Sequence, residues 1–236
     1  MNKFEQLGLS ESLQRAIIDL GFENPTEVQE KAIPMLLEKD TDMVALAQTG
    51  TGKTAAFGFP VIQKIDANNR NTQALILSPT RELCLQITNE IKNYSKYEKG
   101  INVVAVYGGA RITDQAREIK RGAQIIVATP GRMQDMINRG LVNITQINYC
   151  ILDEADEMLQ MGFIDDIRTI LSKASPEKNT WLFSATMPHG IREIVNEHMS
   201  DNAHRIEVNA RNVVNSKIHH QYLICDEAEK LHVLIQ

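Results

Sequence analysis

The sequence has few cysteines, few aromatic residues and no excess of positive charge. Its 236 residues include three cysteines, and aromatic residues make up 5% of the chain. Cys84, Cys150 and Cys225 lie far apart, each in an apolar run, so they have neither the density of a disulfide framework nor the spacing of metal ligands. We therefore expect buried thiols in a reducing compartment, which makes the cytoplasm the expected location.

Long hydrophobic runs are also lacking. The first 13 residues alternate between polar and apolar types, without the apolar centre of a secretory signal peptide, and no later run approaches the length of a membrane span. The net charge is −5 and the sequence pI is near 5.7, which argues against a protein that binds nucleic acid by bulk electrostatics. We expect no membrane partner, and any nucleic-acid site must be local.

What the chain does have is the composition of a globular protein. Hydrophobic residues make up 43% of it and charged residues 23%. A chain of this length buries about 70% of its unfolded surface, so one substantial core needs no disulfide or metal to support it. We expect a single main domain.

One stretch organises the rest. The apolar run 43–46 leads into AQTGTGKT at residues 47–54, and a helix-compatible segment follows. Glycines allow a tight loop whose backbone N–H groups face a phosphate, and the helix start adds its positive end. This is the P-loop pattern with Ala47 in place of the first glycine, and its strand-to-helix context disfavours an ordinary turn with a surface lysine. The residues expected to bind the nucleotide here are Gln48, Thr49, Gly50, Thr51, Gly52, Lys53 and Thr54.

The P-loop pattern assigns separate roles to two side chains. Lys53 would reach the β- and γ-phosphates of a nucleotide as a point charge. The Thr54 hydroxyl would help to hold a magnesium ion that keeps several of its waters.

Short apolar runs alternate with longer amphipathic stretches along the chain. The runs are 43–46, 74–77, 103–107, 125–128, 150–152, 181–183 and 205–208, and helical patterns such as 80–97 and 164–172 lie between them. Continuous apolar runs indicate strands that are covered on both faces, and alternation with helices indicates right-handed crossovers. We predict an α/β fold with a mainly parallel sheet sandwiched by helices.

Two helices are expected before the first strand. An amphipathic stretch within residues 1–22 predicts the first helix. The second begins after Pro25, with Thr26 as N-cap and Gln29 three residues on, which is the spacing of a capping box.

Polar residues follow most of the strands, at the end where ligands bind in parallel sheets. Asp153 and Glu154 come directly after the run 150–152. We expect this strand to lie next to the strand of the P-loop, which makes Asp153 the candidate second magnesium ligand, and Glu154 could orient or deprotonate the attacking water. Acidic residues that merely complement a helix N-terminus are the alternative, which a neighbouring P-loop disfavours.

Three further segments follow strands and could be caps of the next helix. Residues 184–186 (SAT) are a weak signal by themselves and could simply be such a cap. Residues 79–82 (PTRE) and 129–132 (TPGR) each place a hydroxyl and an arginine at a helix start, which could be a cap or a phosphate site. Together with Gly108 and Gly109, whose bare backbone permits close approach, they make a strip of phosphate sites plausible without a basic surface.

With these residues assembled, the chain resembles the N-terminal RecA-like domain of the DEAD-box ATP-dependent RNA helicases. Seven short motifs occur in family order between Phe4 and about Val208, a set too specific to recur by chance. The resemblance implies a RecA-like P-loop NTPase fold, ATP and Mg²⁺ as cofactors, and RNA as partner. It divides the chain into a RecA-like domain at 1–208, a linker at 209–217 and the start of a truncated second RecA-like domain at 218–236.

The resemblance also implies roles for individual residues. Lys53, Asp153 and Glu154 are catalytic, and Thr54 and Asp153 hold Mg²⁺, partly through water. Adenine is recognised by a segment called the Q motif, comprising Phe4, Phe22, Thr26 and Gln29. RNA phosphates and sugars are gripped by Pro79, Thr80, Arg81, Gly108, Gly109, Thr129, Pro130, Gly131 and Arg132. Asp156, Ser184 and Thr186 couple the nucleotide site to strand separation.

The family's arginine-rich motif from the second domain, which completes the ATP site, has no counterpart in this chain. The segment HRI at 204–206 resembles its beginning but lies where the last strand of the first domain is expected. We therefore expect the chain to bind nucleotide but to hydrolyse it poorly. Two alternatives remain: a nucleotide- and RNA-binding module without catalysis, and a DNA helicase or translocase built on the same type of domain.

Overall fold

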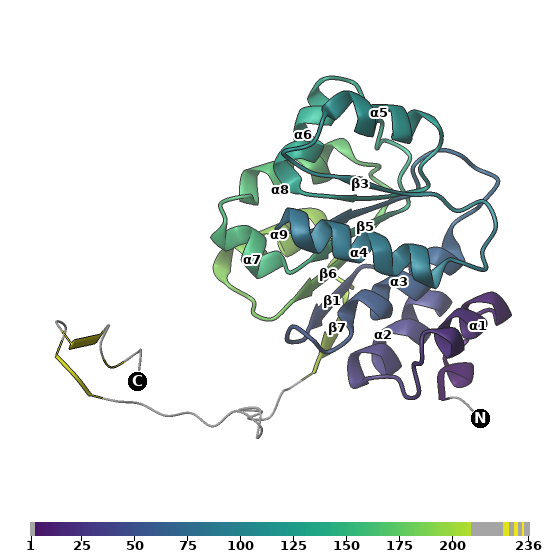
Figure 1. Cartoon of the computed structure of the whole chain (residues 1–236), viewed down its shortest axis with the longest axis horizontal. Helices are drawn as coiled ribbons and strands as arrows, with labels where there is room; N and C mark the ends of the chain where they lie inside the picture. Colours follow the sequence, from purple (N-terminus) through teal and green to yellow (C-terminus); the bar gives the residue numbers. More distant parts are fainter. Residues whose placement is uncertain (1–2, 209–223, 227–228, 231–232, 234–236) are drawn as a thin grey trace.

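A parallel sheet forms the centre of the molecule. The computed structural model describes residues 3–208, 224–226, 229–230 and 233 (Figure 1). Within them, seven strands run parallel in the order β3-β4-β2-β5-β6-β1-β7. The strands are β1 (Met43–Leu46), β2 (Ala74–Leu77), β3 (Val103–Val106), β4 (Ile125–Ala128), β5 (Tyr149–Asp153), β6 (Asn179–Ser184) and β7 (His204–Glu207).

Helices cover both faces of this sheet. One face packs against the 3₁₀ helix η1 (Lys3–Leu7), α1 (Glu11–Asp19), α2 (Glu27–Glu38), α3 (Lys53–Lys64) and α4 (Arg81–Tyr94). The other packs against α5 (Ile112–Lys120), α6 (Pro130–Asn138), α7 (Ala155–Gln160), α8 (Ile164–Lys173) and α9 (His189–His198). The predicted α/β fold with a helix-covered parallel sheet is confirmed.

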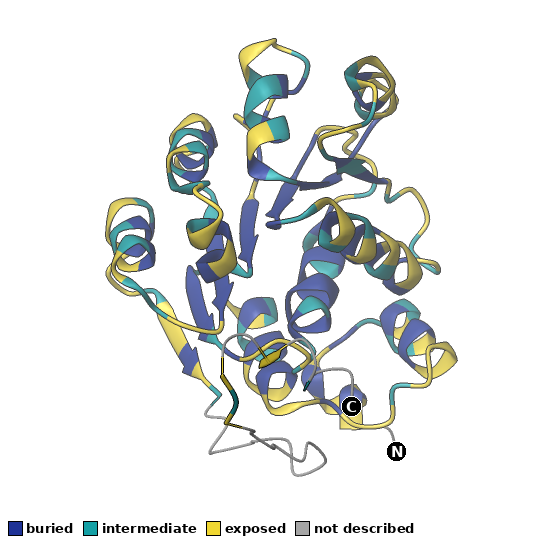
Figure 2. Cartoon of the chain, turned by 60° about the vertical axis from the view of Figure 1, so that its left-hand side comes forward, coloured by how far each residue is buried: buried dark blue, intermediate teal, exposed yellow. Residues whose placement is uncertain are grey.

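The continuous apolar runs are explained by this two-sided cover. Successive strand residues point to opposite faces, so Met43 and Ala45 join one core while Val44 joins the other. Figure 2 shows the inner strands buried between helices whose outer sides are exposed, whereas the edge strand β7 is mostly exposed. Strands covered on both faces need no polar residue at alternate positions, which is why the runs did not alternate.

Most predicted boundaries agree with the structure. The bounds of β1, β2 and β4 match, whereas β5 and β6 extend further because polar end residues such as Asp153 and Asn179 still pair in the ladder. The first predicted helix is η1 followed by α1. The predicted capping box of α2 is present: Thr26 is the N-cap, and its backbone N–H donates to Gln29 Oε1 at 3.0 Å.

One expectation about strand order is wrong. The strand that carries Asp153, β5, does not neighbour the P-loop strand β1, because β6 lies between them. The order of strands depends on which helices cross over which face, and no local sequence pattern records this. Asp153 still ends at the same edge of the sheet as the P-loop, one strand further away.

The last part of the chain is only partly described. His204–Glu207 pairs with β1 as the expected last strand of this domain. The predicted linker at 209–217 lies outside the described residues, and so does most of the predicted start of a second domain at 218–236. None of the described helices has both the length and the apolar content that a bilayer span requires.

Candidate nucleotide and RNA sites

The loop between β1 and α3 adopts the conformation that its glycines predict. Gly50 and Gly52 have φ angles of +80° and +86°, in the left-handed region that glycine tolerates. Thr51 Oγ1 donates to Gln48 O at 2.7 Å and fixes the bend. Gly52 is the N-cap of α3, so the backbone N–H groups of the first helical turn face the space beside the loop.

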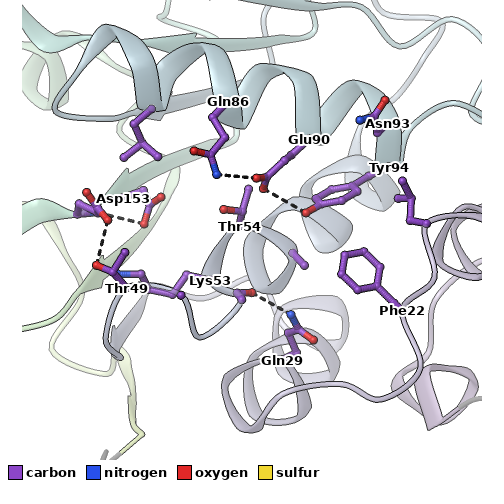
Figure 3. Close-up of a pocket in the computed structure, with 16 residues that line it drawn as sticks. Phe22, Gln29, Thr49, Lys53, Thr54, Gln86, Glu90, Asn93, Tyr94 and Asp153 are labelled. Atoms are coloured by element: carbon purple, nitrogen blue, oxygen red, sulfur yellow. Dashed lines mark hydrogen bonds between the residues drawn. The ribbon is translucent and has the colours of Figure 1, made fainter. Parts of the chain in front are cut away.

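Lys53 is the first residue of α3, and its side chain is buried without a partner. The residue is 6% exposed, and within the described part of the chain its Nζ has no hydrogen-bond partner. A buried ammonium group costs free energy unless an anion compensates it. It lines a cavity of about 420 Å³, so an anionic ligand there would satisfy it (Figure 3).

The cavity has an aromatic and amide end. Phe22 and Gln29 line it, and the rings of Phe22 and the buried Phe4 are tilted with centroids 6.1 Å apart. Gln29 accepts from Thr26 N through Oε1, and its Nε2 donates to Gly52 O at 3.0 Å. One amide therefore caps α2 and contacts the phosphate loop, which brings the Q-motif residues and the P-loop into one site.

The opposite end is acidic. Asp153 is 3% exposed, and burial raises the pKa of its carboxyl to about 7, although the nearby Lys53 charge lowers it. Its Oδ1 accepts from Glu154 N at 3.1 Å. Glu154 accepts from Thr49 Oγ1 at 3.2 Å and has φ +53°, a strained angle for a residue with a side chain. Loop, lysine and both carboxylates thus border one cavity.

Residues of α4 form a wall of this cavity that sequence reasoning missed. Glu90 accepts from Gln86 Nε2 at 2.8 Å and from Tyr94 OH at 3.2 Å, and all three line the cavity (Figure 3). Their one-turn spacing on a helix was visible, but nothing local indicated which element that face would meet.

Asp156, Ser184 and Thr186 form one hydrogen-bonded cluster. Asp156 N donates to Ser184 Oγ at 3.2 Å, while Thr186 N and Oγ1 both donate to Asp156 Oδ2 at 2.9 and 2.7 Å. Burial would raise the pKa of Asp156, but the hydrogen-bonding groups of Thr186, Ser184 and Ala185 together outweigh it and lower the pKa. The helix that follows, α9, has Pro188 as its N-cap, so these hydroxyls do not cap it.

The expected RNA-binding segments meet at the ends of neighbouring strands. Thr80 caps α4 by accepting from Leu83 N at 3.2 Å; Thr129 is the N-cap of α6, and Pro130 opens that helix. These follow β2 and β4, and Gly108 and Gly109 follow the adjacent β3. The strip lies at the same end of the sheet as the nucleotide cavity.

The two arginines of this strip contact the glycine loop. The Arg81 guanidinium lies over the Tyr107 ring, 4.8 Å from its centroid. Arg132 Nη1 donates to Ala110 O at 3.0 Å. Both were expected to face RNA phosphates, and both also have partners within the chain.

Comparisons with known proteins agree with this geometry. The model of the DEAD/DEAH box helicase family matches residues 26–194. Among curated relatives, the ATP-dependent RNA helicase CshA of Listeria monocytogenes is 47% identical over 234 residues, 99% of this chain and 44% of the relative. The RNA helicase CrhR of Synechocystis is 50% identical over 200 residues, 85% of this chain and 40% of the relative.

Solved structures show the same fold. The crystal structure of a DEAD box protein from the hyperthermophile Methanococcus jannaschii matches 98% of this chain and 61% of that chain, with a TM-score of 0.84 and 42% identity. The chain spans half or less of the length of the curated relatives described above.

Proposed function

Because the chain belongs to the DEAD/DEAH box helicase family, we propose that it is the ATP-binding and RNA-gripping N-terminal RecA-like domain of an ATP-dependent RNA helicase. The observation that carries this proposal is the buried Nζ of Lys53 beside the glycine loop, for which the described part of the chain supplies no hydrogen-bond partner. Such a group fits the β- and γ-phosphates of ATP, whose negative charge would compensate it.

The remaining residues of the cavity fit the rest of the nucleotide. The Phe22 ring would stack on adenine, and the Gln29 amide has one further N–H and one further lone pair for the base edge. The Thr54 hydroxyl and the Asp153 carboxylate would hold Mg²⁺ partly through water. Bound Mg²⁺ supplies charge neutralisation for the transferred phosphoryl group. Glu154, which Thr49 orients, would position or deprotonate the attacking water.

RNA would be held through its backbone. The helix starts at Thr80 and Thr129 and the bare Gly108–Gly109 loop offer backbone N–H groups and hydroxyls, which suit phosphates and riboses rather than base edges. We therefore infer binding without sequence specificity, with Asp156, Ser184 and Thr186 relating this strip to the nucleotide site. The buried free thiols of Cys84 and Cys150 support a reducing compartment, such as the cytoplasm.

Full turnover would need a second RecA-like domain of the parent protein. An arginine supplied from another domain is worth about 10³ to 10⁵ in the rate of phosphoryl transfer. This chain should therefore bind ATP well and hydrolyse it slowly, and locally separate RNA strands only as part of the longer protein.

The test measures ATP·Mg²⁺ binding and hydrolysis by this chain, with and without single-stranded RNA. Lys53→Ala should weaken binding about 100-fold, because it removes a charged partner of the phosphates. Lys64→Ala is the matched control: Lys64 ends the same helix and pairs with Asp40 at 2.8 Å, away from the cavity. Equal losses in both variants, or brisk RNA-stimulated turnover by this chain alone, would contradict the proposal.

A binding competition between RNA and DNA single strands of matched sequence distinguishes an RNA helicase domain from a DNA helicase or translocase domain. Since only RNA carries 2′-hydroxyls, a clear preference for RNA is expected. Equal displacement by DNA would favour a DNA helicase or translocase domain.

A further inference from the structure

The loop that joins β3 to α5 carries the two glycines expected to approach RNA. Gly108 and Gly109 are exposed, and a Cβ on Gly108 would meet no atom within 4 Å, so the backbone there is open to a ligand. Gly109 has φ +84°. An open loop with glycines has many conformations available, and ordering one residue costs about 1–2 kcal/mol. A loop that binds phosphate through its backbone therefore gains affinity if the protein orders it beforehand.

A single buried amide holds both sides of this loop. Gln115 lies on α5 and is 6% exposed. Its Nε2 donates to Tyr107 O at 3.1 Å, just before the glycine pair, and its Oε1 accepts from Arg132 Nη1 at 3.2 Å. The same Arg132 nitrogen donates to Ala110 O at 3.0 Å, just after the pair. The two carbonyls that flank Gly108 and Gly109 are thus fixed by one connected set of hydrogen bonds.

The three expected RNA-binding segments are joined through this set. Arg132 belongs to the segment after β4, and Arg81, from the segment after β2, lies over the Tyr107 ring and within 3.4 Å of where a Cβ on Gly109 would be. Gln115 is outside all three segments, yet it connects the loop with Arg132. An uncharged amide suits this position, because it donates to a carbonyl and accepts from a guanidinium at once.

We propose that Gln115 is a positioning residue for RNA binding: through Tyr107 O and Arg132, it holds the Gly108–Gly109 backbone in the conformation that accepts an RNA phosphate. This inference rests on the proposed RNA-binding function. Gln115 itself touches no RNA. Its substitution should act on RNA affinity and leave nucleotide affinity unchanged, since the described residues that line the nucleotide cavity come from the P-loop, the end of β5, α4 and the segment around Phe22 and Gln29, and not from α5 or the Gly108–Gly109 loop.

The test compares Gln115→Ala with Gln124→Ala in this chain. Gln124 is a matched control, because it is 2% exposed and also joins loops through three hydrogen bonds: from Asn102 N at 3.0 Å and to Gly100 O and Ala67 O at 3.0 and 3.3 Å. It does so at the opposite end of the sheet. Both variants should lose similar stability, because each removes the hydrogen bonds that a buried amide makes to backbone groups of loops. Only Gln115→Ala should weaken the binding of fluorescent single-stranded RNA, by about tenfold.

Two further readouts distinguish positioning from other roles. Removing a direct cationic contact to a single strand changes the slope of log K against log salt by about 0.7, whereas the loss of Gln115 should leave that slope unchanged. Combining Gln115→Ala with Gly109→Ala should weaken RNA binding no more than the stronger single variant, because both act on the same loop.

The outcomes separate the two proposals. If wild-type chain binds no RNA, the proposed function fails and the role of Gln115 fails with it. If wild-type chain binds RNA but Gln115→Ala binds as tightly, or no more weakly than Gln124→Ala, the positioning role is wrong while the proposed function stands. Additive losses with Gly109→Ala would also overturn it.

Discussion

The two ends of the parallel sheet differ in how the chain satisfies a buried charged side chain. At the amino end, Asp42 accepts from Thr180 N and Ser200 N, each at 2.6 Å. At the carboxyl end, the Lys53 Nζ has no hydrogen-bond partner among the described residues. Ligands of parallel sheets bind at the carboxyl ends of the strands. The comparison teaches that a buried charge satisfied by backbone groups stabilises the fold, whereas one left without such a partner is available to a ligand.

Asp42→Ala should give the largest change in stability, and it should do so at the amino end of the sheet, away from the nucleotide cavity. It removes the carboxylate that accepts from the buried Thr180 N–H and from the Ser200 N–H, which should lower the free energy of unfolding by about 3 kcal/mol. Denaturant unfolding measures this. Asp40→Ala, whose carboxylate is largely exposed and pairs with Lys64, should cost less than about 1 kcal/mol. Equal losses would remove the distinction between buried and exposed groups at this end.

Asp153→Asn should change the folding stability in the opposite direction, so that the variant is more stable than the wild type. Because burial raises the pKa of Asp153 to about 7, above its ordinary value of 3.8, the folded domain bears the cost of a buried charge at higher pH. A shift of this size is worth about 4 kcal/mol, and burying the amide of Asn offsets part of it, so without metal or nucleotide the variant should be about 2 kcal/mol more stable above pH 7. The gain should shrink as the pH falls through 7 and vanish below about 4. Thermal unfolding at pH 8 and pH 5 checks this, and a variant less stable at pH 8 would break the comparison.

Gly52→Ala should give the smallest change in stability of the three substitutions, but it should also weaken ATP binding. A Cβ there would lie 2.3 Å from Gln29 Nε2, and φ is +86°. We expect a loss of about 1 kcal/mol from the backbone angle, together with weaker ATP binding because Gln29 is displaced. Gly140→Ala is the control, since φ is +65° and no atom lies within 4 Å of the added carbon. Unchanged ATP affinity in a titration would mean that the Gln29–Gly52 contact is not needed by the site.

Local patterns predicted much of the fold and of the site. The bounds of β1, β2 and β4, the capping box at Thr26 and the loop around Lys53 follow from short stretches of sequence, because each depends on residues a few positions apart. The features that the sequence did not predict depend on contacts between segments that are far apart in the chain. The position of β6 between β1 and β5, the α4 wall at Glu90 and the role of Gln115 arise only when helices and strands pack together.

The roles of the site residues stay predictions. The structure adds the contacts that two of these residues make within the chain. Arg81 and Arg132 were interpreted as phosphate contacts from their places at helix starts. Their contacts with Tyr107 and Ala110 could not have been read from those positions, because the partners lie on another strand's loop.

The strand β6 lies between β1, which leads into the P-loop, and β5, which ends in Asp153. Neighbouring strands lie about 4.8 Å apart, so the start of the P-loop and the strand that carries the carboxylate are about 9.6 Å from each other at one edge of the sheet. The intervening β6 acts as a spacer of fixed thickness, so the hydrogen-bond spacing of the sheet fixes where the loop that leads to Lys53 starts relative to Asp153.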